Sequence, residues 1–155
     1  MTGPGSEAID PRARALWART RLAVHPDPVV VASLPRDADA VTLEAAAALA
    51  ARGPFSALVF AADEISLTVP AKVWESCALR DAALGTSGPW AVIALDLEID
   101  LGVTGYLAPA AARLAAAGVP ILPQCAYRKD YLLVLAADCP RALAVLETLI
   151  ADCGG

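Results

Sequence analysis

The chain has 155 residues, of which 57% are hydrophobic and 19% charged, so it can bury a sizeable core and is not a disordered tail. Its net charge of −5 and the scattered placement of its 12 Lys and Arg residues argue against nucleic-acid binding, which needs clustered cations. No run approaches the ~20 apolar residues of a membrane span, and the first residues lack the pattern of a signal peptide. We therefore expect a cytoplasmic protein with no membrane partner.

The cysteine and histidine content bears on metals and redox chemistry. The four cysteines are widely spaced, without a Cys-x-x-Cys pair, and His25 is the one histidine of the chain. A zinc site needs four suitable ligands at close spacing. The sequence therefore predicts free thiols, no metal site and no cofactor.

The first half of the chain is expected to form short strands around two helices. Val29–Leu34 is an apolar run between turns, which is typical of a buried strand. In chain order we expect an extended strand within 17–25, a turn at 25–28, a strand at 29–34, a helix at 42–52 with Thr42 as N-cap, a hairpin of strands 55–61 and 65–69, a helix at 71–84 and a linker at 85–89.

The second half repeats much of this plan. We expect a strand at 90–99, a helix at 106–117 ended by a left-handed glycine at Gly118, strands at 119–126 and 131–135, and a helix from about 139 to 151. This order is the split βαβ arrangement of a ferredoxin-like module, present twice. The second module lacks its closing strand and the first has a strand too many, so the leading strand is expected to be lent to the other module.

The prediction is therefore an α+β fold of two ferredoxin-like (βαββαβ) modules with an exchanged N-terminal strand. A lead-in with the first strand is expected at 1–20, module 1 at 21–86 and module 2 at 87–155.

The sequence contains few residues that could act as catalytic groups. His25 lies in a proline-flanked turn, and no glycine-rich phosphate loop is present. The close carboxylates are Asp63–Glu64 and the alternating row Asp96, Glu98 and Asp100, which we interpret as a solvated face of a strand. We predict no catalytic residues, with a small enzyme built on these carboxylates as the weakest alternative.

Two features suggest a ligand instead. The segment Gly102-Val103-Thr104-Gly105 joins a strand to a helix, where backbone amides can seat a carboxylate, although an ordinary turn has the same composition. Asp130 lies in a turn near Tyr127 and could pair with an ammonium group, although Asp is also common in turns. Together they match the two charged groups of a free amino acid.

The run Gly102–Ile121, followed by Tyr127-x-x-Asp130-Tyr-Leu-Leu-Val134, resembles an ACT domain. The chain is similar to tandem-ACT proteins related to aspartate kinase regulatory domains and to the CASTOR arginine sensors. Asp63-Glu-Ile-Ser66 and Trp90 match two further family positions. The resemblance implies a regulatory sensor, homodimeric or larger, with an amino acid held between its modules.

By this resemblance the ligand contacts two groups of residues. The second module would supply Gly102, Val103, Thr104, Gly105, Tyr127 and Asp130, and the first would supply Ser66 and Leu67, with Glu64 and Ile65 as further candidates. The family's hydroxyl-bearing residues are replaced at Ala61–Ala62 and at Pro123–Ala126. These departures favour the alternative of a ligand-free ACT-type oligomerisation or interaction module.

Overall fold

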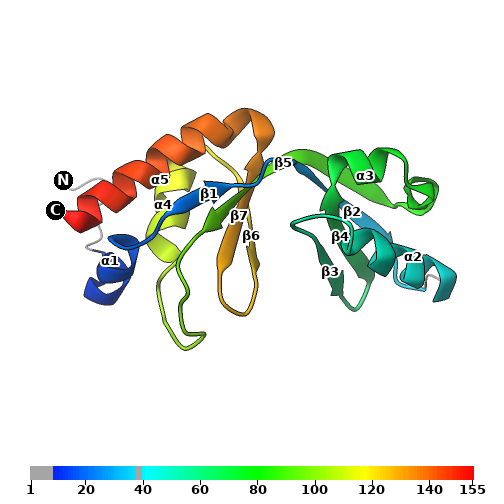
Figure 1. The fold of residues 1–155 in the computed structure, drawn as a ribbon, viewed down its shortest axis with the longest axis horizontal. Coiled ribbons are helices and arrows are strands. Elements are labelled where there is room, and N and C mark those ends of the chain that lie inside the picture. Colours follow the sequence, from blue (N-terminus) through cyan, green and yellow to red (C-terminus); the bar gives the residue numbers. More distant parts are fainter. Residues whose placement is uncertain (1–8, 38–39) are drawn as a thin grey trace. The chain divides into compact units, whose positions relative to one another are not determined.

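The structure is a computed structural model that describes residues 9–37 and 40–155. The chain divides into two compact units (Figure 1). The central unit is His25–Val92, and the flanking unit combines the chain up to Val24 with Ile93–Gly155. Strand β5 (Gly85–Leu95) gives its first part to the central unit and its last part to the flanking unit.

The central unit has the ferredoxin-like order of elements. Its strands follow the sheet order β3-β4-β2-β5, and each neighbouring pair is antiparallel. The elements before β5 are β2 (Val29–Pro35), α2 (Ala40–Ala50), β3 (Ala57–Phe60), β4 (Glu64–Pro70), α3 (Ala71–Glu75) and the 3-10 helix η1 (Ala78–Ala82).

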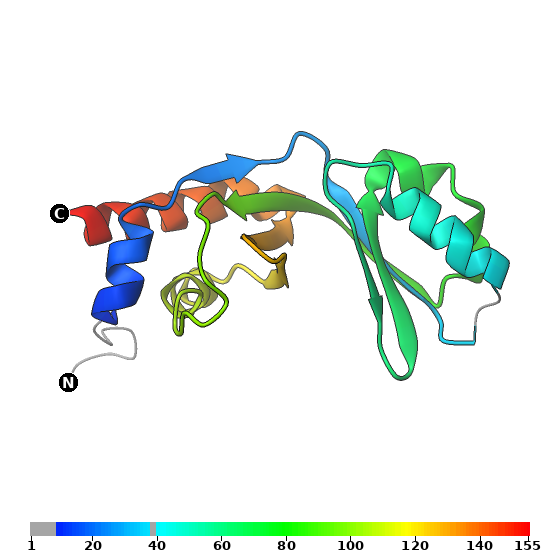
Figure 2. The ribbon, with the colours of Figure 1, turned by 60° about the horizontal axis from the view of Figure 1, so that its bottom comes forward.

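The core of this unit lies between one face of its sheet and its helices. Figure 2 shows these helices lying next to the strands. Alternation along β4 places Ile65, Leu67 and Val69 on the buried face, because successive side chains of a strand point to opposite sides. Register pairs them with Leu34, Ala32 and Val30 of β2. Trp74 of α3 and Leu79 of η1 complete the same cluster.

The flanking unit has the sheet order β1-β5-β7-β6. Strand β1 is antiparallel to the end of β5, with Leu22 opposite Leu95, and takes the edge position of the missing closing strand. This pairing confirms the predicted exchanged N-terminal strand. The elements are α1 (Pro11–Trp17), β1 (Leu22–Val24), α4 (Ala108–Ala116), β6 (Ile121–Cys125), β7 (Asp130–Leu135), the 3-10 helix η2 (Ala136–Asp138) and α5 (Cys139–Gly154).

The predicted left-handed glycine at the end of a helix is confirmed in this unit, and a proline lies in a strand where its missing N–H is tolerated. Gly118 has a φ of +67° at the end of α4, and its N–H donates to the carbonyl of Ala115 while the N–H of Val119 donates to that of Leu114. This bonding satisfies carbonyls that the helix end leaves free. Pro123 lies in β6, which pairs on one side with β7 and is an edge strand, as expected of a residue without an N–H.

Several predicted boundaries are wrong. The expected helix 71–84 is broken at Ser76–Cys77 into α3 and η1, and the expected linker 85–89 is the first part of β5. The expected strand within 17–25 is shortened to β1, because Trp17 ends a helix. Thr42 lies inside α2, not at its cap, and α4 begins at Ala108, two residues later than expected.

Candidate functional site

The loop between β5 and α4 carries the four residues predicted to hold a ligand's backbone groups. Asp100 organises its start: the carboxylate Oδ1 accepts the Gly102 N–H at 2.7 Å, and the Asp100 carbonyl accepts the Val103 N–H at 3.0 Å. Within residues 9–37 and 40–155, the structure gives the amides of Thr104 and Gly105 no acceptor. Two of the four backbone amides predicted to hold a ligand, those of Gly102 and Val103, thus bond to Asp100 within the loop itself.

Tyr106 fixes the other end of this loop. Gly105 has a φ of +78°, a conformation that glycine adopts without steric cost, and it turns the chain so that Tyr106 is buried with 3% of its surface exposed. The sequence predicted that the loop leads directly into a helix at Tyr106, but α4 begins at Ala108. A further turn intervenes before α4.

Asp130 is the first residue of β7 and lies opposite Cys125 in the register of β6 and β7. Partial desolvation and a hydrogen bond with Asp130 raise the pKa of the Cys125 thiol to about 11. Burial raises the pKa of Tyr106 to about 12, and the charge of Asp130 adds to this rise while the Thr20 hydroxyl offsets part of it. The Asp130 carboxylate is therefore in hydrogen-bonding contact with Cys125, and its charge acts on Tyr106 electrostatically.

The contact between Asp130 and Cys125 can be tested by thiol reactivity. With a pKa of about 11, roughly one Cys125 in a thousand is a thiolate at pH 8, so alkylation should be slow although the residue is exposed. Asp130→Asn removes the negative charge that disfavours the thiolate, and we expect Cys125 to react several-fold faster with iodoacetamide (roughly threefold or more). Mass spectrometry of alkylated peptides measures the rate.

Cys139 is the internal control for this experiment. Burial alone raises its pKa, so its alkylation rate should be the same in the variant and in the original protein. An equal acceleration at Cys125 and Cys139 would indicate general loosening of the fold, and no acceleration at Cys125 would place the Asp130 charge elsewhere.

The predicted row of carboxylates lies just beyond the end of β5 and not on a strand. Asp96 forms an ion pair with Lys129, and Glu98 forms one with Arg128 at 3.3 Å. The Lys129 ammonium lowers the pKa of Asp96 through this pairing. Asp96 and Glu98 thus pair with the β6–β7 turn, whereas Asp100 bonds to the loop that follows it. The prediction that the three carboxylates share one face of a strand is wrong.

A hollow of about 410 Å³ lies where this row meets the β6–β7 turn. Tyr127, with 79% of its surface exposed, lines it together with Glu98, Asp100, Leu101 and Arg128. Of the predicted ligand residues in the described chain, Tyr127 lines this hollow, whereas Asp130 and the loop 102–105 do not.

The predicted residues of the central unit lie next to one another on β4. The side chains of Ile65 and Leu67 are fully buried in the core of that unit, so only their backbone could touch a ligand. Ser66 is half-buried on the other face of the strand, opposite Ser33. Glu64 is also half-buried, and its carboxylate accepts a hydrogen bond from the Ser33 hydroxyl.

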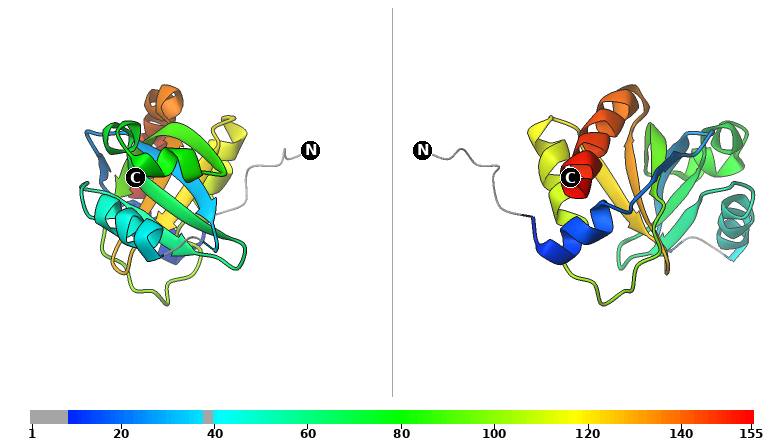
Figure 3. Two further views of the ribbon diagram at one scale, coloured as in Figure 1. Left: turned by 90° about the vertical axis from the view of Figure 1, so that its right-hand side faces the viewer. Right: turned by 60° about the vertical axis from the view of Figure 1, so that its left-hand side comes forward.

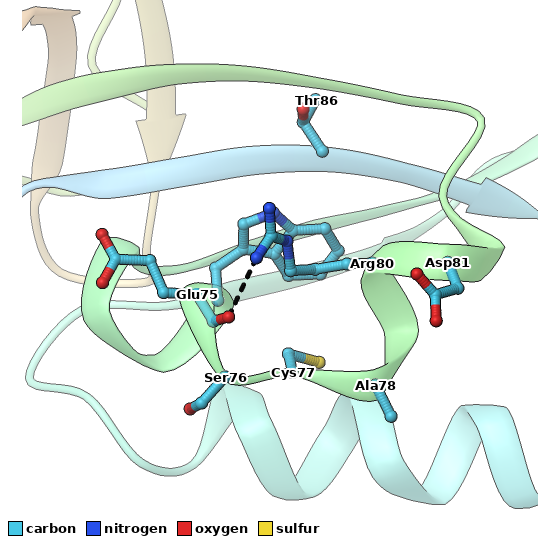
Figure 4. Close-up of a pocket in the computed structure, with 8 residues that line it drawn as sticks. Glu75, Ser76, Cys77, Ala78, Arg80, Asp81 and Thr86 are labelled. Atoms are coloured by element: carbon cyan, nitrogen blue, oxygen red, sulfur yellow. Dashed lines mark hydrogen bonds between the residues drawn. The ribbon is translucent and has the colours of Figure 1, made fainter.

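The central unit has a second hollow, of about 540 Å³, that the sequence did not predict. Arg80 lies at its centre and donates to the Glu75 carbonyl at 2.9 Å (Figure 4). The carboxylates of Glu75 and Asp81 point to opposite sides, away from the guanidinium, and the Thr86 side chain extends toward it from β5. The hollow is polar and exposed, and the predicted ligand residues are not among those that line it in the described chain.

Across residues 9–37 and 40–155, no three His, Cys, Asp or Glu side chains gather closely enough to hold a metal ion. All four cysteines are free thiols. Of the helices described, none has the length and apolar character required to cross a bilayer.

Residues 86–148 match the family model of the ACT domain. The match begins in β5 and covers the loop 102–105, Tyr106 and Asp130. No curated protein sequence matches the chain.

Solved structures resemble the chain over most of its length. A Vibrio cholerae protein of unknown function, described as a possible transport protein, has a TM-score of 0.68 at 17% identity, covering 93% of this chain and 99% of its own. An Agrobacterium tumefaciens protein has a TM-score of 0.68 at 18% identity, covering 84% and 89%. The regulatory subunit of aspartate kinase from Thermus flavus has a TM-score of 0.60 at 15% identity, covering 83% and 95%. These likenesses confirm the predicted α+β fold with ACT-like, ferredoxin-type modules.

Proposed function

We propose that this protein is a regulatory sensor that binds a free amino acid and is not an enzyme. The observation that carries the proposal is the ACT match over residues 86–148, which contains both the loop and Asp130. The structural likeness to a regulatory subunit of aspartate kinase supports a regulatory role for the fold. We further propose a tandem-ACT, CASTOR-like arrangement, a homodimeric or larger assembly and a cytoplasmic location.

In this proposal the free amides of Thr104 and Gly105 receive the ligand's α-carboxylate, as backbone N–H groups do at anion sites. Asp130 pairs with its ammonium group, and Tyr127 lies near the same turn. From the central unit, Ser66 contributes a hydroxyl, and Leu67, Glu64 and Ile65 contribute backbone groups. The amino acid is thus proposed to be held by residues of both modules.

A thermal-shift screen of the twenty amino acids tests the proposal. A ligand at ~100 times its Kd should stabilise the folded state by about 2.7 kcal/mol, because it binds that state alone. We expect at least one amino acid to raise the melting temperature, and Asp130→Ala to remove that rise by deleting the carboxylate that faces the ammonium. Asp63→Ala, on the exposed turn of the β3–β4 hairpin, is the matched control and should leave the rise intact.

A second candidate function is a ligand-free oligomerisation or interaction module. It is favoured by the internal contacts of the site, because Asp100 already holds two loop amides and Asp130 already contacts Cys125. Under this alternative no amino acid shifts the melting temperature at millimolar concentration, while the protein still forms dimers or larger assemblies by light scattering.

A further inference from the structure

The short helix α1 packs against the part of the flanking unit that carries the proposed ligand loop. It begins with Asp10 as N-cap, whose carboxylate accepts the N–H groups of Arg12 at 2.9 Å and Ala13 at 3.3 Å. Ala13 and Trp17 are buried on its inner face. Figure 3 shows α1 beside the C-terminal end of α5, where Arg14 donates to the Asp152 carbonyl at 2.7 Å.

Trp17 makes two contacts with the single residue Tyr106. Its indole stacks on the phenol ring with the centroids 5.1 Å apart and the planes inclined by 20°. Its Nε1–H donates to the Tyr106 carbonyl at 2.7 Å in a buried setting. The ring and the backbone of Tyr106 are thus held by one side chain that is completely buried.

Thr20, just after α1, holds the other end of the Tyr106 side chain. Its hydroxyl donates to the Leu16 carbonyl at 2.9 Å. The same Thr20 oxygen lies 2.8 Å from the Tyr106 hydroxyl, and either group can donate in this buried contact. Breaking this contact would strand a buried hydroxyl, which costs more than an exposed hydrogen bond.

Tyr106 is the point where these contacts meet the proposed site. It directly follows Gly105, and its hydroxyl lies within the electrostatic reach of Asp130. A second connection reaches the helix after the loop, because Arg113 of α4 pairs with the Asp152 carboxylate at 2.6 Å. The loop is therefore tied to α1 at Tyr106, and α4 is tied to the same end of α5 that α1 contacts.

We propose that Trp17 and Thr20 are positioning residues for the ligand loop: through Tyr106 they hold residues 102–105 in the conformation that receives the carboxylate. This inference rests on the proposed amino-acid site for its function, but the structural part stands independently. By thermodynamic reciprocity, a ligand that orders the loop must also tighten α1. Docking of α1 and occupation of the loop then reinforce one another.

Hydrogen exchange measures the structural part without any ligand. In Thr20→Val and in Trp17→Phe, which keeps an aromatic ring but lacks the indole N–H, we expect the hydrogen-bonded loop amides of Gly102 and Val103 to exchange about fivefold faster. Thr148→Val is the matched control, since the Thr148 hydroxyl makes the same bond to a carbonyl four residues earlier, at 2.9 Å, on the exposed side of α5. That control should leave exchange in the loop unchanged.

The outcomes separate the inference from the proposed function. Unchanged exchange of the Gly102 and Val103 amides in both variants, with circular dichroism showing that the variants remain folded, overturns the positioning role. If exchange rises but no amino acid stabilises the original protein, the positioning role stands and the amino-acid site falls. If an amino acid does bind, its affinity should be about fivefold lower in Thr20→Val. The bound amino acid should also slow hydrogen exchange across α1 in the original protein. An unchanged affinity in Thr20→Val overturns the coupling between α1 and the loop.

Discussion

Trp17→Ala is expected to lower the free energy of unfolding of the flanking unit by about 3–5 kcal/mol, the range measured for large buried aromatics. The side chain is completely buried, so its removal leaves a cavity that the surrounding helices can only partly fill. The change also deletes the stacking on Tyr106 and leaves the Tyr106 carbonyl without its indole donor. Urea unfolding followed by far-ultraviolet circular dichroism measures the loss, because this signal does not depend on the deleted indole.

Tyr127→Ala is the matched control for this prediction. It also deletes an aromatic ring from the flanking unit, but that ring has 79% of its surface exposed, and we expect a change of about 0.5 kcal/mol or less. A loss below ~1 kcal/mol in Trp17→Ala would mean that α1 does not pack as described, and the positioning role of Trp17 would fall with it.

The order of strands and helices could be predicted because residues that end helices and strands separate most of the elements. Apolar runs bounded by proline and glycine located the central strands, and Gly118 marked the end of α4. The exchanged strand was predicted from the number of strands in each module, because the second module lacked a closing strand and the first had one too many. In the structure β1 takes that position, with Leu22 opposite Leu95 of β5.

The helix α1 was missed because residues 1–20 were interpreted as a lead-in and the first strand. Asp10-Pro11 carried the signal that could have found it, since Asp is a favoured N-cap and proline is favoured at the first helical position. The linker predicted at 85–89 was also wrong. Glycine and proline suggested a break, but Thr86 and Ser87 pair with β2, and Pro89 lies where the register with β2 shifts, a place in which a strand tolerates proline.

The candidate site was predicted as residue types and not as contacts. Sequence spacing could indicate that Gly102–Gly105 joins a strand to a helix, but not that Asp100 would satisfy two of its amides. It could not place Trp17 against Tyr106 either, because 89 residues separate them and no local pattern encodes that distance. Such long-range contacts depend on the whole packing of the unit.

Leu67→Ala is expected to destabilise the central unit by about 2–5 kcal/mol, whether or not the protein binds an amino acid. Leu67 is completely buried and belongs to the cluster that joins β4 to α2, α3 and η1. Its partner across the sheet is Ala32, a small residue that cannot fill the space left behind. The loss is again measured by urea unfolding.

Ser66→Ala, at the neighbouring position on the same strand, separates structure from ligand binding. Ser66 is half-buried on the opposite face of β4 and faces Ser33, so its removal should change the free energy of unfolding by about 0.5 kcal/mol or less. If the proposed site includes its hydroxyl, the thermal shift produced by the amino acid should nonetheless shrink in this variant. A full shift in Ser66→Ala would remove the Ser66 hydroxyl from the proposed site. The alternation that buries Leu67 directs the Ser66 side chain to the opposite face of β4, so the two variants test the two faces separately.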